Sequence, residues 1–251
     1  MTIILTMTIN LYEMNPQIYD DYINTQIEKI NFDEVFNLIS KIANKKESIE
    51  ILDLCCGTGI FPRKWLTKLN NVKYVGVDIN SSFIKFAKEK LGNNKFSFVV
   101  DDSVSFKANK KFDIVLATSS YHHIRDEQKR DFLKNVFAHL KNDGFLIVYE
   151  KIVDSFSDKI EAIDSGTKFY LERIKYMMKT EKLSDNQLFA LFNEQYLTAI
   201  RKEEYKVDFQ YFKADVENSG MKIKEHIKLW PKENLFHNDK VGDFIFLIVK
   251  S

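Results

Sequence analysis

The stretch Ile49-Glu50-Ile51-Leu52-Asp53-Leu54-Cys55-Cys56-Gly57-Thr58-Gly59-Ile60-Phe61 decides the fold of this chain. It begins as an apolar run of strand length, breaks at two glycines, and continues with apolar residues at helical spacing. The pattern predicts a strand, a tight turn and a helix. In an open α/β sheet such a turn lies at the carboxyl ends of the strands, where a ligand can approach backbone N–H groups. A nucleotide-like ligand is therefore the first hypothesis.

Two aspartates and one proline narrow the choice of ligand. Asp53 precedes the turn, and Asp78 ends the next apolar strand, where a carboxylate can accept both hydroxyls of a ribose. A carboxylate at position 53 would repel a pyrophosphate but would suit a ligand that carries an ammonium group. The third glycine of a dinucleotide fingerprint would fall at Pro62. These features favour S-adenosylmethionine (SAM) over NAD.

Residues 53–59 resemble the glycine loop of the class I SAM-dependent methyltransferases, which reads acidic-x-Gly-x-Gly-x-Gly, with Cys55 in place of the first glycine. The resemblance covers roughly residues 35–150. It implies a doubly wound, Rossmann-like α/β sheet of seven strands that closes with an antiparallel C-terminal hairpin. It also implies SAM as the cofactor, bound by Asp53, Cys55, Gly57, Gly59, Asp78, Ile79, Asp102, Ser103 and Thr118. For Asp102, which the family pattern places near the adenine, a solvated turn is a competing interpretation.

Composition limits the other classes of function. A chain of 251 residues with 45% hydrophobic residues can form one α/β domain with an appended element. The net charge of +1, from 37 basic and 36 acidic residues, gives no global field to attract nucleic acid, so no DNA partner is expected. The adjacent Cys55 and Cys56 suit neither an ordinary disulfide nor a metal site, and no metal is expected.

No membrane partner is expected either. Residues 1–7 are apolar but short and lack a basic region, and no apolar run reaches 18 residues. We expect a cytoplasmic protein that is a monomer or a homodimer.

The chain divides into four predicted segments. Residues 1–44 form N-terminal cap helices, one starting near Pro16 and a second restarting at Asn31. One of Tyr12, Tyr19 and Tyr22 is expected to contact the ligand, while the alternative is packing with the hydroxyls at the surface. Residues 45–154 alternate strands and helices, which predicts a mostly parallel sheet and the SAM-binding core.

The other two segments complete the predicted sheet and its cover. Residues 155–206 form helices rich in aromatic residues and methionine, interpreted as a lid whose inward aromatics line the acceptor site. Such stripes are more often ordinary core. Residues 207–251 supply a helix and the antiparallel hairpin.

The loop after the fourth strand contains His122 and His123, where methyl donor and acceptor should meet. A histidine there can accept the proton of a hydroxyl or amine acceptor, so both are candidate catalytic residues. One ring is expected to face the pocket and the other the core. Alignment without a dedicated base is the alternative. The loop lacks the Asp/Asn-Pro-Pro-Tyr/Phe motif of enzymes that methylate amino groups of nucleic acids and glutamine.

The sequence therefore predicts a SAM-dependent methyltransferase with a small-molecule acceptor. An alternative is the family that makes carboxy-SAM for wobble-uridine modification, and hence a tRNA pathway, because Glu150-Lys151 and the segment 214–220 look like it. That family has an arginine near positions 213–214, where this chain has Asp215. A non-catalytic SAM-binding protein is the third alternative.

Overall fold

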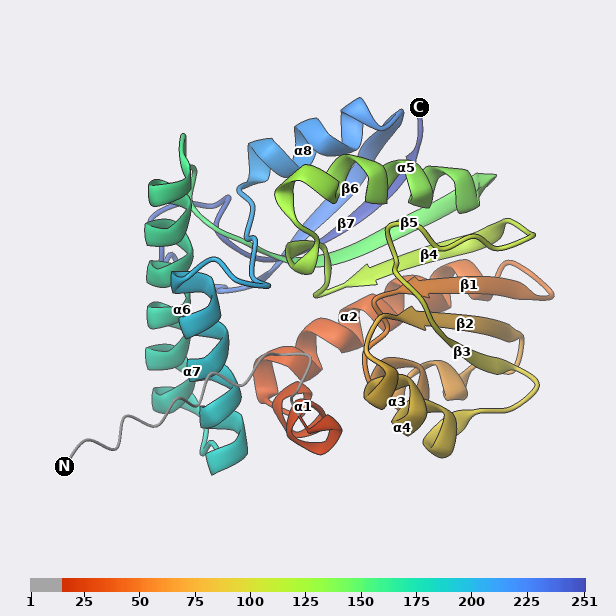
Figure 1. Ribbon diagram of the computed structural model, residues 1–251, viewed down its shortest axis with the longest axis horizontal. Helices are drawn as coiled ribbons and strands as arrows, with labels where there is room; N and C mark the ends of the chain where they lie inside the picture. The colour runs from red at the N-terminus through yellow and green to blue at the C-terminus, as the bar shows by residue number, and fades with distance from the viewer. Residues whose placement is uncertain (1–14) are drawn as a thin grey trace.

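The computed structural model describes residues 15–251, so Tyr12 and the apolar residues 1–7 lie outside the described residues. Seven strands form one sheet in the order β3-β2-β1-β4-β5-β7-β6 (Figure 1). The strands are β1 (Ile49–Leu54), β2 (Val72–Asp78), β3 (Phe96–Val100), β4 (Phe112–Thr118), β5 (Leu140–Ile152), β6 (Met221–Trp230) and β7 (Gly242–Lys250). β1 to β5 pair in parallel, and β7 runs antiparallel to both of its neighbours. The predicted fold, including the antiparallel closure, is confirmed.

Helices cover both faces of the sheet because successive strand residues point to opposite sides. Ile51 and Ile114 belong to one apolar core, and their neighbours Leu52 and Val115 belong to the other. The first core is covered by α2 (Gln26–Ala43), α3 (Ile60–Lys64) and α4 (Ser81–Leu91), and the second by α5 (Lys129–His139) and α8 (Phe209–Asn218) (Figure 1). No helix lies in residues 101–111, between β3 and β4.

Two predicted boundaries were wrong. The first helix, α1 (Pro16–Ile23), is followed by α2 from Gln26, not from Asn31, because Thr25 has the extended backbone of a helix N-cap. Asn31 lies buried inside α2, and its amide donates hydrogen bonds to Tyr149 Oη and Asp243 Oδ2. The apolar run at residues 145–150 predicts a strand that begins at Phe145, but β5 begins at Leu140, and residues 141–144 form an irregularity in its pairing with β4.

The segment predicted as a lid contains α6 (Lys159–Thr180) and α7 (Asp185–Ala199). Both stand at the end of the sheet toward which the arrow of β4 points, and α7 packs against α1 (Figure 1). Within residues 15–251, no helix combines the length and hydrophobicity needed to cross a membrane.

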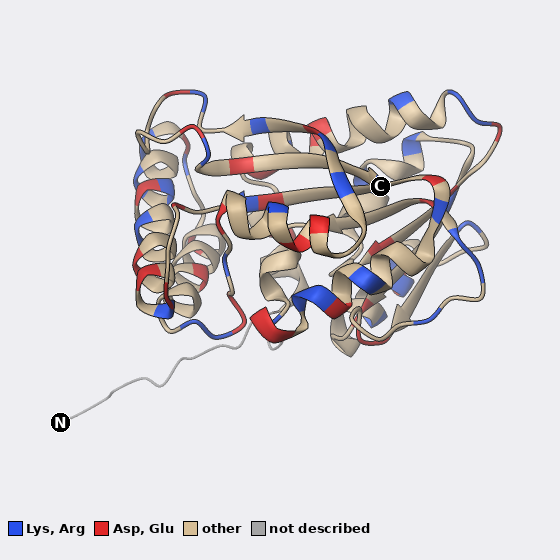
Figure 2. Cartoon of the chain, turned by 90° about the horizontal axis from the view of Figure 1, so that it is seen from above, with Lys and Arg blue, Asp and Glu red and all other residues tan. Residues whose placement is uncertain are grey.

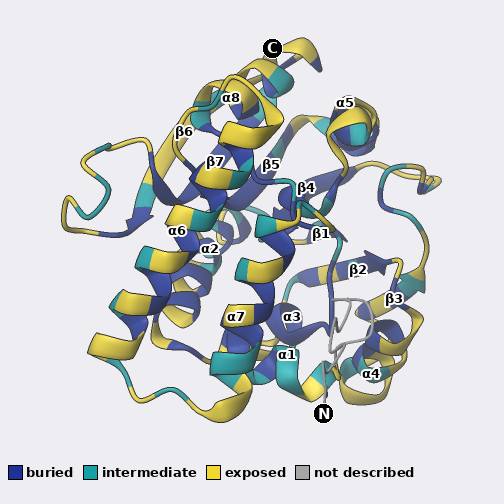
Figure 3. Cartoon of the chain, turned by 60° about the vertical axis from the view of Figure 1, so that its left-hand side comes forward, coloured by how far each residue is buried: buried dark blue, intermediate teal, exposed yellow. Residues whose placement is uncertain are grey.

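A buried ionic network joins this helical end to the sheet. Arg173 of α6 donates to Asp243 of β7 and to Glu28 of α2, at 2.8 and 2.7 Å, and all three side chains are fully buried. Lys151 of β5 lies 3.4 Å from Glu28. The Tyr22 hydroxyl also reaches Glu28, at 3.0 Å, so the alternative that placed the tyrosine hydroxyls at the surface is wrong for Tyr22. Figure 3 shows that the helix faces toward this region are buried.

Charges of both signs alternate over the outside of the molecule (Figure 2). This distribution agrees with the net charge of +1.

Candidate functional site

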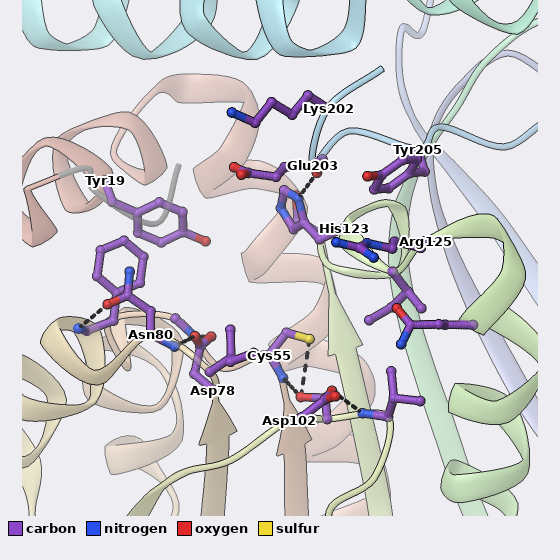
Figure 4. A pocket seen from close by; sticks show the side chains of 18 residues that line it. Tyr19, Cys55, Asp78, Asn80, Asp102, His123, Arg125, Lys202, Glu203 and Tyr205 are labelled. Carbon is purple, nitrogen blue, oxygen red and sulfur yellow. Dashed lines mark hydrogen bonds between the residues drawn. The ribbon is translucent and has the colours of Figure 1, made fainter. Parts of the chain in front are cut away.

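A cavity of about 510 Å³ lies at the carboxyl ends of β1, β2 and β4, a size typical of small-molecule sites (Figure 4). The first residues of α4, Tyr19 of α1 and the segment 202–205 complete its wall. Seven of the predicted site residues line it: Cys55, Gly57, Asp78, Ile79, Asp102, Ser103 and His123. Residues from distant parts of the sequence therefore meet where the glycine turn predicted a ligand.

The turn after β1 is held open by its backbone conformation and by Asp78. Gly57 has φ +57°, and its N–H donates to Asp78 Oδ2 at 2.8 Å, while Asn80 N–H donates to Oδ1 at 2.9 Å. Burial raises the pKa of Asp78. A Cβ atom at Gly57 would approach the ring of Tyr19 to 3.4 Å, so Tyr19 covers this turn. Of Tyr19 and Tyr22, the two predicted tyrosines within the described residues, Tyr19 borders the cavity and Tyr22 does not.

Cys55 and Ser103 connect the turn to the end of β3. Cys55 also has a positive φ, +67°, and its N–H donates to Ser103 Oγ at 3.0 Å. Burial raises the pKa of the Cys55 thiol, which keeps it protonated. Asp102 accepts the Val104 N–H at 2.8 Å and also lines the cavity. The two interpretations of Asp102, turn former and ligand neighbour, are therefore compatible.

Three predicted cofactor residues do not line the cavity. Asp53 lies buried beneath the turn, where its carboxylate accepts a hydrogen bond from the Tyr74 hydroxyl at 2.7 Å. Burial and the nearby Asp78 raise the pKa of Asp53 to about 7, although the hydrogen bond from Tyr74 lowers it. Gly59 faces Ala87 and Phe98, where a Cβ atom would come within 3.0 Å of either, so it serves helix packing. Thr118 is the buried last residue of β4. Direct contact of these residues with a cofactor stays a prediction.

The two histidines point in different directions. The His122 ring is buried, with Nδ1 2.5 Å from Glu150 Oε1, and burial together with Lys206 lowers its pKa well below the ordinary value. The His123 ring lines the cavity, and its Nδ1–H donates to the Glu203 carbonyl at 2.7 Å. A ring proton on Nδ1 leaves Nε2 of His123 as the acceptor. The structure thus places His123, and not His122, on the cavity wall.

The segment 202–205 was missed by sequence reasoning. Lys202, Glu203 and Tyr205 line the cavity, whereas no aromatic residue of α6 or α7 does, which corrects the expectation that the inward aromatics form the acceptor site. Those aromatics, such as Phe169 and Tyr170, are buried in the core. No local sequence pattern indicated a role for this segment, because contacts with distant residues place it at the cavity. One of them is the hydrogen bond that the Tyr205 N–H donates to the His122 carbonyl at 2.6 Å.

Arg125 was also missed, although it follows the histidine loop directly. Arg125 and Lys202 are exposed cations that line the cavity, and within residues 15–251 no hydrogen bond or ion pair engages either side chain. Glu203 lines the same part of the wall. This end of the cavity therefore offers two uncommitted positive groups.

Comparison with known proteins gives a consistent result. The family model described as "Methyltransferase domain" matches residues 51–144. The chain is 26% identical over 232 residues to malonyl-[acyl-carrier protein] O-methyltransferase 1 of Ilyobacter polytropus. This alignment covers 90% of this chain and 83% of that protein. The second enzyme of that name in the same organism is 28% identical over 125 residues, so the chain matches about half of its length.

Solved structures share the fold. A SAM-dependent methyltransferase from Clostridium acetobutylicum superposes with a TM-score of 0.61 at 15% identity, over 96% of this chain and 100% of that one. The plantazolicin methyltransferase BpumL, solved with a substrate analogue and S-adenosylhomocysteine, gives a TM-score of 0.59 at 17% identity, over 94% and 90% of the two chains.

Proposed function

Since this chain is a class I SAM-dependent methyltransferase, we propose that it transfers the methyl group to an oxygen of a small, anionic acceptor such as a carboxylic acid. The observation that carries the proposal is the pair of uncommitted cations, Arg125 and Lys202, on the cavity wall. The names of the relatives from Ilyobacter polytropus support it, because a malonyl group ends in a carboxylate.

The cavity divides into two ends. The residues at the ends of β1, β2 and β3 fit SAM: the Asp78 carboxylate keeps unused lone pairs for the ribose hydroxyls, and Gly57, with the Tyr19 ring above it, borders the same cavity. When bound, SAM supplies a sulfonium methyl group, which forms a bond to the acceptor oxygen while the carbon–sulfur bond breaks and its electrons return to sulfur.

The other end orients the acceptor. Arg125 can hold a carboxylate through two parallel N–H bonds, and Lys202 adds a point charge. An ionised carboxylate needs no base, so alignment suffices for it. His123 is the candidate base for an acceptor that still carries a proton, because its Nε2 remains an acceptor while Nδ1–H is bound to Glu203. Any effect of His122 on methyl transfer is transmitted through neighbouring residues, because its ring hydrogen-bonds to Glu150 and does not line the cavity.

The test compares Arg125→Gln with Arg130→Gln, which removes the same charge from an exposed position of α5 outside the cavity. With malonyl thioesters as acceptors and formation of S-adenosylhomocysteine as the readout, Arg125→Gln should raise the acceptor KM about 10- to 150-fold, as expected for the loss of charge-assisted hydrogen bonds. SAM affinity should stay unchanged. An acceptor KM equal to that of Arg130→Gln would refute the anionic acceptor.

The carboxy-SAM alternative lacks the arginine that its family has near positions 213–214. Asp215 accepts a hydrogen bond from Tyr121 Oη at 2.7 Å and does not line the cavity. The tRNA role, the cytoplasmic location and the monomeric or dimeric state remain predictions from the sequence.

A further inference from the structure

Three side chains converge behind the cavity wall at His123. His122, His123 and Glu204 each offer one ligand atom, and these atoms lie within 4.8 Å of one another. His122 Nε2 is 3.7 Å from Glu204 Oε2, and His123 Nδ1 is 3.6 Å from Glu204 Oε1. Two imidazoles and one carboxylate are a common ligand set for divalent transition metals.

Glu204 is unusual for a buried carboxylate. It is 0% exposed, and within the described part of the chain neither of its oxygens accepts a hydrogen bond. Buried carboxylates normally collect hydrogen bonds, because the charge is costly to desolvate. The buried Lys206 ammonium lies 2.7 Å from Oε2 and partly compensates the charge, but Oε1 faces His123 without a bonded partner.

His122 is already oriented as a metal ligand. Glu150 holds its Nδ1 at 2.5 Å and also accepts its backbone N–H at 3.1 Å. Metal-bound histidines usually give their second nitrogen to a carboxylate in this way, which fixes the ring and its proton. With that proton between Nδ1 and Glu150, the Nε2 lone pair faces Glu204 Oε2. Two acceptors facing each other in a buried place favour a nearby cation, and the Lys206 ammonium, 2.7 Å from Oε2, is the one that a metal ion would have to displace.

We propose that His122, His123 and Glu204 form a binding site for a divalent metal ion of the Zn²⁺ or Co²⁺ type. Ligands about 2.0–2.1 Å from a tetrahedral ion stand roughly 3.3–3.5 Å apart. The separations of 3.6 and 3.7 Å, which involve different oxygens of Glu204, are close to this value, and the three ligand atoms must draw together from within 4.8 Å of one another. His123 would exchange its bond to the Glu203 carbonyl for the ion and move its ring proton to Nε2. The expectation of no metal was based on the two adjacent cysteines, and Glu204, some eighty residues from the histidines, did not enter it.

Three protein ligands leave a fourth position for water or substrate. Because His123 lines the cavity, an ion bound there can polarise an acceptor oxygen. That consequence rests on the proposed function, whereas binding of the ion does not.

The test titrates the full-length protein, after treatment with a chelator, with Co²⁺ alone, and follows visible absorption and calorimetric stoichiometry. We expect one equivalent of Co²⁺ to bind per chain, with a visible absorption spectrum typical of a four-coordinate ion that has nitrogen and oxygen ligands. Glu204→Gln should weaken binding roughly 100-fold or more, since it removes a charged ligand, while Glu233→Gln at an exposed site should leave it unchanged. Lys206→Met should tighten binding at least about tenfold, because the competing ammonium is gone.

Absence of stoichiometric Co²⁺ binding in both the wild type and Lys206→Met would overturn the site, as would equal binding by Glu204→Gln. If Glu204→Gln fails to fold, His123→Ala takes its place in the test, because His123 is partly exposed. The same loss of Co²⁺ affinity is expected for it. Methyl transfer to the malonyl thioester is assayed separately, so a failure of the proposed acceptor leaves the binding result readable.

Discussion

At the scale of single residues, Asp53 couples the stability of the fold to pH. Its pKa is raised to about 7, mainly by burial, from an ordinary value near 3.8. The folded state therefore retains a proton that the unfolded chain loses, and the contribution of Asp53 to stability is complete below about pH 4 and lost as the pH rises toward 7.

Asp53→Asn should remove this part of the pH dependence. Between pH 4 and pH 7 the free energy of unfolding of the wild type should fall by an additional amount on the order of 4 kcal/mol compared with the variant. Chemical denaturation across this range measures the difference, with the exposed Asp131→Asn as the control. Parallel pH profiles for the wild type and Asp53→Asn would show that Asp53 is ionised in the folded protein.

At the scale of elements, a buried lysine adds to the hydrogen bonds of His122 and His123 that hold the segment 202–205 against the histidine loop. Lys129, at the start of α5, is buried, and its ammonium donates to the carbonyls of Ile124 and Tyr205 at 2.5 and 3.0 Å. Burial lowers its pKa to about 8. A cation at a helix N-terminus is unfavourable for the helix dipole, so this lysine serves the loops more than the helix.

Lys129→Met should loosen the acceptor end while leaving the cofactor end in place. We expect the acceptor KM to rise about tenfold or more, because the hydrogen bonds of the charged Lys129 ammonium to Ile124, Asp126 and Tyr205 disappear. The SAM affinity should stay within a factor of about two. Steady-state kinetics and calorimetry measure the two quantities, and Lys134→Met, exposed on the same helix, is the control. A SAM affinity that falls as much as the acceptor affinity would contradict this division of the cavity.

Patterns of neighbouring residues in the sequence predicted most strands of the sheet. They failed for residues whose role depends on contacts with distant parts of the chain. The glycine turn and the alternating apolar runs are determined within a few residues, so β1 to β4 were placed closely. Tyr205 and Glu204 could not be assigned, since their roles depend on meeting His122 and His123 across some eighty residues. Asp53 was expected to face the ligand, but the hydroxyl of Tyr74 on the neighbouring strand holds it beneath the turn.

At the scale of the whole molecule, the buried pairs of Arg173 connect three elements distant in sequence. Glu28 comes from α2 and Asp243 from β7, while Arg173 lies on α6. Lys151 and Arg173 lower the pKa of Glu28 to about 2 in spite of its burial. The helical end of the molecule therefore depends on charge compensation as well as on apolar packing.

Arg173→Met should destabilise the whole fold, because it leaves two carboxylates buried with reduced compensation. The expected loss is about 3–5 kcal/mol in the free energy of unfolding, measured by chemical denaturation against Arg130→Met at an exposed position. A loss below about 1 kcal/mol would mean that water or rearranged side chains compensate Glu28 and Asp243.

The exposed position of Arg125 and Lys202 also governs how an acceptor reaches the enzyme. With a net charge of +1 the molecule exerts little attraction from a distance, and at physiological ionic strength a single charge acts only within a Debye length of about 8 Å. The proposed anionic acceptor would therefore feel Arg125 and Lys202 only over the last few ångströms before it touches the rim. Added salt should shorten its residence time and slow its association only slightly.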